Sequence, residues 1–242
     1  MFIENKVKEL RLKGINKYEI SAILKPKLKK FTPSPSGVYN ILRRNSLNKL
    51  TPKMKEEHRK IIKDKAGELG HIDCHYLAKG IIEGIEKRLY LVCIIDSCTR
   101  IAWAELVEDI KSLTVMFATL KSINMFFQEF QIKFQEVLTD NGSEFGNRNH
   151  KNKEEHPFER MLMELNIKHR YTRPYRPQTN GKVERFWKTI EEDLLAETSF
   201  DSIEEFKDEL VQYMYYYNYQ RPHQGINGKI PAEFNKNCQR IT

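Results

Sequence analysis

The chain has 242 residues, of which 40% are hydrophobic, enough to bury the core of one large domain or of a small domain beside a medium one. No apolar run approaches the ~18 residues that span a bilayer, and the charged first residues lack the apolar stretch of a secretion signal. We therefore expect a cytoplasmic protein with no membrane partner.

The net charge of +8 is distributed unevenly along the chain. Residues 1–65 contain 18 Lys or Arg and 6 Asp or Glu, whereas the remaining residues contain 23 and 27. A basic arm on a mildly acidic body is typical of nucleic-acid binding proteins, because Lys and Arg displace the counterions of phosphates. A solvated surface without such a ligand is the alternative. The four cysteines show no zinc-binding spacing, so we predict reduced thiols.

Helical periodicity predicts three short helices near the N-terminus, over residues 3–13, 17–24 and 37–44, with a basic loop at 25–30. Their starts carry capping residues. Asn16 and Glu19 form a capping box before the second helix, and Ser36 is expected to cap the third.

Three short helices joined by tight basic loops suit a helix-turn-helix. We assign this DNA-binding domain to residues 1–46 and a basic linker to residues 47–66. A core domain follows over residues 67–236, and residues 237–242 form a tail.

The core begins with strands. Alternation predicts a strand at 69–77, a nearly continuous apolar run predicts a central strand at 89–96, and a third strand follows at 101–107. The later elements are predicted as a helix at 112–130, a strand at 134–139, a helix at 157–165, a strand at 168–172 and helices at 180–197 and 202–218. This order predicts an α/β fold, with a mixed sheet flanked by helices and a meander at one edge.

The helix at 112–130 has an apolar stripe at helical spacing, which we expect to face the core. Its members are Leu113, Met116, Phe117, Leu120 and Phe127, with Asn124 at the edge.

Three carboxylates have suggestive positions. Asp73 lies inside a strand, Asp140 follows an apolar strand, and Glu184 lies in the first turn of an amphipathic helix. Ligand sites of α/β sheets collect at strand ends, and carboxylate oxygens suit Mg²⁺ ions that assist phosphoryl displacement. A chance grouping is the strong alternative, since the chain has 33 acidic residues.

Several blocks of the sequence resemble the integrase-core, DDE-type transposases of insertion sequences. The blocks HIDCHY (71–76), LTDNGSEF (138–145) and RPYRPQTNGKVERFWKT (173–189) are similar to their first-aspartate, second-aspartate and glutamate motifs. YNYQRPHQGINGKIPAEF (217–234) is similar to their C-terminal signature, and SPSGVYNILRRNSL (34–47) to the end of their helix-turn-helix. The resemblance implies an RNase H-like fold with a mixed five-stranded sheet.

By position, the resemblance implies that Asp73, Asp140 and Glu184 are the catalytic residues. They would bind two Mg²⁺ ions, or Mn²⁺ in their place, with Asp73 bridging both. The implied activity is hydrolysis at transposon ends followed by strand transfer into target DNA. The implied partners are double-stranded DNA, namely terminal inverted repeats and target, and further copies of the chain in a homo-oligomer. Such a prokaryotic protein would associate with the nucleoid when bound to DNA.

One departure from the family is the gap between Asp140 and Glu184, which is longer than in retroviral integrases. We assign the extra residues to the polar stretch 146–156, read as an extended surface loop that costs little stability.

The window 168–188 contains seven Lys or Arg and a single acid, Glu184. Basic residues around a metal ligand are typical of phosphate contacts, although Glu184 and Lys188 could simply form an ion pair. The predicted DNA-contacting residues are Arg43, Arg44, Arg173, Tyr175, Arg176, Lys182, Arg185 and Lys188.

Three residues are expected to support the site without binding metal: His71, Asn141 and Glu144. His71, Asp73 and His75 share a strand face by alternation, so a His-Asp-His metal site is conceivable. Two imidazoles suit zinc or iron better than magnesium.

Other polar residues favour structural roles. Asp96 precedes Ser-Cys-Thr-Arg and is interpreted as a hairpin-turn residue rather than a catalytic one. The tyrosines at 213–219 lack the Arg and His set of a tyrosine recombinase and are expected to pack in the core. Two other functions stay open: an RNase H-like nuclease without strand transfer, and an inactive or truncated transposase that only binds DNA.

Overall fold

The computed structural model describes residues 2–49, 63–146, 152–172, 180–196 and 198–239. The chain divides into two compact units, Met1–Arg59 and Lys60–Thr242. Most of the predicted linker lies outside the described residues, so its bounds stay a prediction.

The first unit is a three-helix bundle. Its elements are α1 (Phe2–Leu12), α2 (Lys17–Leu28), the 3₁₀ turn η1 (Lys29–Phe31) and α3 (Pro35–Arg44). Each helix contributes two buried apolar side chains to a common core, namely Val7, Leu10, Ile20, Leu24, Val38 and Leu42. The predicted capping box is confirmed, because the Asn16 side chain accepts from the Glu19 amide and the Glu19 carboxylate accepts from the Asn16 amide.

Two local predictions for this unit are wrong. The basic loop expected at 25–30 is mostly helical, because α2 continues to Leu28 with Pro26 in its last turn. A proline this late removes a single helical hydrogen bond. The third helix starts earlier than predicted: Ser34, not Ser36, caps it by accepting from the Gly37 amide, and Pro35 takes the first helical position, where a missing N–H is harmless.

The second unit has five strands: β1 (Gly70–Leu77), β2 (Leu89–Asp96), β3 (Ala102–Val107), β4 (Glu136–Thr139) and β5 (Lys168–Tyr171). Its longer helices are α4 (Ser112–Phe130), α5 (Pro157–Glu164), α6 (Gly181–Ile190), α7 (Ile203–Tyr219) and α8 (Pro231–Gln239). Among the described residues, single 3₁₀ turns lie at Lys153–Glu155 and Gln224–Ile226, and a π-helical turn at Glu191–Leu195 follows α6. The sequence prediction missed α8, and β4 is shorter than predicted.

The strands form one sheet in the order β3-β2-β1-β4-β5. β1, β2 and β3 are an antiparallel meander, whereas β4 pairs in parallel with both β1 and β5. The predicted mixed five-stranded sheet with a meander at one edge is therefore confirmed. The apolar run of β2 is buried along nearly its whole length because helices cover both faces of the sheet.

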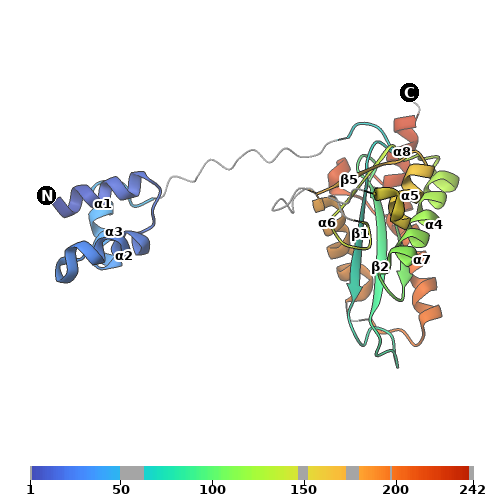
Figure 1. Ribbon diagram of the computed structural model, residues 1–242, viewed down its shortest axis with the longest axis horizontal. Coiled ribbons are helices and arrows are strands. Elements are labelled where there is room, and N and C mark those ends of the chain that lie inside the picture. The colour runs from blue at the N-terminus through green and yellow to red at the C-terminus, as the bar shows by residue number, and fades with distance from the viewer. Residues whose placement is uncertain (1, 50–62, 147–151, 173–179, 197, 240–242) are drawn as a thin grey trace. The chain divides into compact units, whose positions relative to one another are not determined.

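The helices lie on two sides of the sheet (Figure 1). α4 packs against β2 and β3, and α5 packs against α4 and β5, whereas α6 covers β1 and β2. Alternation along β1 therefore gives its two faces different surroundings. Ile72 is buried in the main core, while Asp73 and His75 contact Trp187 of α6.

The face that α4 presents to the sheet differs from the predicted one. Its buried side chains are Val115, Ala118, Thr119, Ser122, Ile123, Phe126 and Phe130. Leu113 and Phe117, expected in the core, are 54% and 62% exposed. The helix carries apolar residues all round, so periodicity alone could not select the face. Among the described residues, no helix has the length and apolarity that crossing a bilayer would require.

Candidate active site

Asp73 lies in the middle of β1 on the face that α6 covers. Its Oδ2 accepts a hydrogen bond from Trp187 Nε1 at 2.8 Å. Burial raises the pKa of this carboxyl to about 6; the hydrogen bond from Trp187 opposes the rise, and the charges of Asp140 and Glu184 add to it. The three predicted catalytic carboxylates therefore share one electrostatic environment.

Sheet register explains why the two aspartates meet. Parallel pairing aligns Gly70 with Val137 and His71 with Leu138, an offset of 67 positions. The same offset relates Asp73 to Asp140, just beyond the last paired residues. Asp140 follows β4 directly, and its Oδ1 accepts from the Gly142 amide at 2.8 Å, which turns the chain away from the sheet.

Glu184 lies in the first turn of α6, and its side chain is exposed. It has no hydrogen bond or ion pair to any described residue. The alternative of an ion pair with Lys188 is not found, because Lys188 Nζ lies 3.6 Å from Glu192 instead. The buried side chains of Val183, Phe186, Trp187 and Ile190 anchor this amphipathic helix in the core, so Glu184 stands at the border between core and solvent.

The donor set suits a hard cation. Three carboxylates close enough to perturb one another, two of them exposed, offer oxygen ligands to Mg²⁺ or Mn²⁺. A cation bound among them would offset their mutual repulsion. In the described part of the chain, no three acidic, histidine or cysteine side chains form a closed metal cluster as they stand.

The loop after Asp140 brings its two predicted supporting residues near the site. Asn141 Nδ2 donates to the Thr172 carbonyl at 3.2 Å, which ties the loop to the chain after β5. The Glu144 carboxylate folds over Gly142, where an added Cβ would lie 2.5 Å from Glu144 Oε1. Burial and the charge of Asp140 raise the pKa of Glu144. A side chain at position 142 would therefore displace the Glu144 carboxylate.

His71 and His75 flank Asp73 on the same strand face but have different surroundings. His71 is buried, and its pKa falls to about 3 because burial and the charge of Lys182 disfavour the imidazolium. His75 stacks on Trp187 and lies 3.0 Å from Glu191. The His-Asp-His alternative gains no support, since the Nε2 of His75 faces a different carboxylate.

A buried series of hydrogen-bonded polar side chains, which the sequence did not predict, ends at Thr139, the residue before Asp140. Thr139 Oγ1 lies 2.9 Å from His169 Nε2 and donates to the Asp140 carbonyl at 2.8 Å. His169 Nδ1 lies 3.1 Å from Glu159, which also accepts from Tyr171 at 2.6 Å. Burial alone would raise the pKa of Glu159, but the hydrogen bonds from His169 and Tyr171 outweigh it and lower that pKa.

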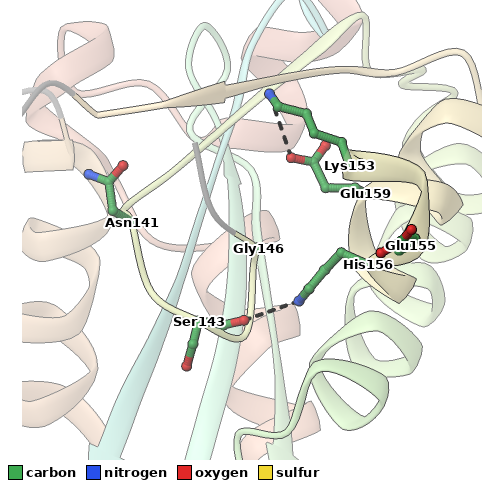
Figure 2. A pocket seen from close by; sticks show the side chains of 7 residues that line it. All are labelled: Asn141, Ser143, Gly146, Lys153, Glu155, His156 and Glu159. Carbon is green, nitrogen blue, oxygen red and sulfur yellow. Dashed lines mark hydrogen bonds and ion pairs between the residues drawn. The ribbon is translucent and has the colours of Figure 1, made fainter. Parts of the chain in front are cut away.

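These residues come from β4, β5 and α5, so no local sequence pattern could have connected them. Glu159 also lines a cavity of about 470 Å³ beside the loop that follows Asp140. Figure 2 shows this cavity between the loop and the segment 153–159, with His156 hydrogen-bonded to the Ser143 carbonyl. The three predicted catalytic carboxylates do not line it.

Asp96 has the structural role predicted for it, but the core packing predicted for the tyrosines of α7 is only partly confirmed, because Tyr213 and Tyr217 are buried whereas Tyr215 and Tyr216 are each 44% exposed. The buried Asp96 accepts from the amides of Gly67, Cys98 and Thr99 and from the Thr99 hydroxyl, which closes the β2–β3 turn. Tyr217 is buried edge-on to Phe186 at 5.3 Å.

The predicted DNA-contacting residues fall into three groups. Arg43 and Arg44 are exposed in the last turn of α3. Lys182, Arg185 and Lys188 lie on α6. The remaining three, Arg173, Tyr175 and Arg176, lie outside the described residues, as do residues 147–151 of the expected loop extension.

Comparison with known families gives two matches. Residues 64–177 match one family described as "Integrase core domain", and residues 165–231 match a second with the same description. The two matches overlap and together cover all the elements that carry Asp73, Asp140 and Glu184.

Curated relatives share the same region. The ORF3 protein of Spiroplasma virus SpV1-C74, which carries the name of an integrase, is 29% identical over 77% of this chain and 53% of its own length. The transposase for insertion sequence element IS904 of Lactococcus lactis is 28% identical over 41% of this chain and 37% of its own. The chain thus spans about half, or less, of the length of these relatives.

Solved structures show the same fold at low identity. A chain of the simian T-cell lymphotropic virus intasome in complex with the PP2A regulatory subunit B56 gamma has a TM-score of 0.57, with 13% identity over 95% of this chain and 74% of that chain. The catalytic core domain of BIV integrase has a TM-score of 0.52, with 19% identity over 72% of this chain and 97% of that chain. The expected RNase H-like fold is therefore confirmed.

Proposed function

Because this chain belongs to the integrase core domain family, we propose that it is a DNA transposase that hydrolyses phosphodiester bonds at transposon ends and joins those ends to target DNA. The observation that carries the proposal is the grouping of Asp73, Asp140 and Glu184 on the α6 side of an integrase-type sheet, beside the end of β4. The relatives named as an integrase and as a transposase support the same reaction class.

In the proposed reaction, water attacks the phosphorus of a phosphodiester at the transposon end, and the strand's 3′ oxygen leaves as a hydroxyl. That hydroxyl then attacks a phosphodiester of the target, which releases a target 3′-hydroxyl. The two divalent ions, when bound, would stabilise the attacking and leaving oxygens of each displacement. Asp73, Asp140 and Glu184 are the residues that would hold them.

Trp187 keeps this set in place. Its hydrogen bond to Asp73 joins the helix that carries Glu184 to the central strand. The hydrogen bond from the Gly142 amide fixes the direction of the Asp140 carboxylate. The chain's own contribution is therefore to fix the directions of the Asp73 and Asp140 carboxylates beside Glu184, so that the ions that would stabilise the anionic transition state find oxygen ligands already in place.

A homo-oligomer is part of the proposal, because two transposon ends must be joined in one complex. The exposed apolar side chains of α4, Leu113 and Phe117, together with Tyr215 of α7, provide a surface on which a second copy could pack. Solvent exposure of such side chains on one surface is typical of an interaction site.

The deciding experiment is a strand-transfer assay with a transposon-end duplex that has been cut in advance, in the presence of Mg²⁺. Joined product is expected. Hydrolysis without joined product would favour an RNase H-like nuclease, and DNA binding without either reaction would favour an inactive transposase that only binds DNA.

A further inference from the structure

A second cavity, of about 550 Å³, lies on a different face of α6 from the carboxylate site. We call it the basic pocket. Three segments that are distant in sequence build it: Arg100 from the β2–β3 turn, Lys182 and Arg185 from the start of α6, and the stretch 221–225 after α7. The last stretch belongs to the C-terminal sequence signature, which the proposed reaction does not use.

The lining of the basic pocket is strongly cationic. It contains four Lys or Arg side chains and His223, against the single acid Glu192. Arg221 is paired with Asp193 at 2.7 Å. The side chain of Arg185 is exposed and has no ion pair with any described residue. Positive charge therefore exceeds negative charge inside this cavity.

The positive charges of the basic pocket repel one another. Burial, together with the charges of Arg100, Arg221 and Arg185, lowers the pKa of His223 to about 4. Because like charges in a partly buried space disfavour each other, an anion that enters the pocket would remove a standing repulsion.

Two glycines, Gly225 and Gly181, line the walls of the basic pocket. An added Cβ on Gly225 would lie 3.0 Å from Arg100 Nε and 3.1 Å from His223 Nδ1, so the glycine lets these two side chains approach the cavity. At the other wall, a Cβ on Gly181 would meet no atom within 4 Å. Asn180, which precedes α6, makes no side-chain cap. A helix N-terminus beside arginines is a favourable place for a phosphate group.

We propose that the basic pocket binds a phosphate of the DNA backbone next to the carboxylate site, an inference that rests on the proposed function. Lys182 and Arg185 lie within one turn of Glu184 on the same helix. A DNA strand bound at the carboxylate face of α6 therefore also passes the face that lines the basic pocket. The pocket thereby gives the C-terminal signature a role: Arg221 and His223 complete a clamp that positions the strand.

The test compares duplex binding across salt concentrations for the wild type and two variants, without divalent ions so that no strand is cut. Arg185→Ala removes a pocket charge. Gly225→Val removes no charge but fills the cavity against Arg100 and His223. Each lost phosphate contact reduces the slope of log affinity against log salt by about one, so both variants should show that reduction. Lys207→Ala, an exposed cation of α7, is the matched control and should keep the wild-type slope.

The outcomes separate the two proposals. If Arg185→Ala has the reduced slope but Gly225→Val does not, Arg185 acts as a surface cation and the pocket is overturned. If both variants match the wild type, the pocket does not contact DNA. Calorimetric titration with inorganic phosphate then shows whether it takes free phosphate instead, which would also overturn the inference. If the wild type binds no duplex, the proposed transposase function itself fails. Circular dichroism verifies that each variant is folded.

Discussion

Trp187 Nε1 donates a hydrogen bond to Oδ2 of Asp73 over 2.8 Å. The indole is buried beneath α6, three residues after Glu184, so this one bond fixes the helix that carries Glu184 against the strand that carries Asp73. A hydrogen bond to a carboxylate contributes about 1.5–3 kcal/mol, which makes Trp187 a positioning residue of the proposed site.

Replacing Trp187 with Phe should therefore lower kcat/KM for strand transfer by about tenfold to a hundredfold, because most of the aromatic bulk stays and the donor is lost. Trp103→Phe is the matched control, since Trp103 also donates to a carboxylate at 2.8 Å, that of Glu105, on β3. Equal losses in the two variants would show that the bond to Asp73 has no special role.

Neutral isosteres of the three carboxylates should abolish chemistry but not DNA binding. We expect Asp73→Asn, Asp140→Asn and Glu184→Gln each to slow cleavage and joining by on the order of 10³-fold or more, since several kcal/mol of charge stabilisation depend on the bound ions. Glu144→Gln, at a carboxylate beside Asp140, should keep most of the activity. Full activity in any of the three isosteres would remove that residue from the site.

The buried pair of Glu159 and His169 should stabilise the fold next to Asp140. His169→Ala leaves Glu159 buried without one of its partners, and we expect a loss of about 3–5 kcal/mol in the free energy of unfolding, measured in urea. The control is Lys168→Ala, on the same strand as His169, which removes an exposed ion pair with Glu136 of β4. This variant should lower the free energy of unfolding by less than about 1 kcal/mol. A loss of similar size in both variants would contradict the role of the buried pair.

His223 should make stability depend on pH. Its pKa is about 4 in the folded protein, against 6.5 for the free side chain. Between these values the unfolded chain binds a proton that the folded chain does not, so stability falls as pH falls from 6.5 towards 4, by up to about 1.4 kcal/mol per pH unit. The groups around His223 are Arg100, Arg221 and Arg185, with Tyr217 at 6.2 Å between ring centroids.

The variant His223→Gln should therefore lose less stability than the wild type over this pH range. Thermal unfolding of both proteins at a series of pH values gives the comparison. If the stabilities of the two proteins fell in parallel from pH 6.5 to 4, the pKa of His223 would be the same in the folded and unfolded chains, which would contradict the prediction.

Phe117 should contribute to self-association. Its side chain is 62% exposed on α4, so Phe117→Ser removes apolar surface without opening a core cavity. We expect weaker association by sedimentation equilibrium and little change in the melting temperature. Leu12→Ser, at a 76% exposed position on α1 of the first unit, is the control for lost surface hydrophobicity and should leave association unchanged. An unaltered association constant for Phe117→Ser would place the contact elsewhere.

Local sequence was sufficient for most of the elements, although it missed α8 and misplaced the end of α2 and the start of α3. The continuous apolar run predicted β2 with its observed bounds, and the length of α4 was likewise correct, because these patterns are set by backbone periodicity. Asp73, Asp140 and Glu184 were identified from motif resemblance, and each has its predicted local position: Asp73 inside β1, Asp140 directly after β4 and Glu184 in the first turn of α6. The amphipathic character predicted for the helix that carries Glu184 is confirmed, because the buried apolar residues of α6 occupy one side only.

Only the tertiary structure determined which residues distant in the sequence contact one another and which face of α4 is buried. α4 has apolar residues on all sides, so only packing against β2 and β3 determined that Phe126 is buried and Phe117 exposed. The parallel register of β1 and β4 brings Asp73 beside Asp140, and that register depends on hydrogen bonds between strands far apart in the chain. The basic pocket joins Arg100 to Arg221 for the same reason. Periodicity is a property of a few consecutive residues, whereas such contacts exist only once the sheet and its helices have packed.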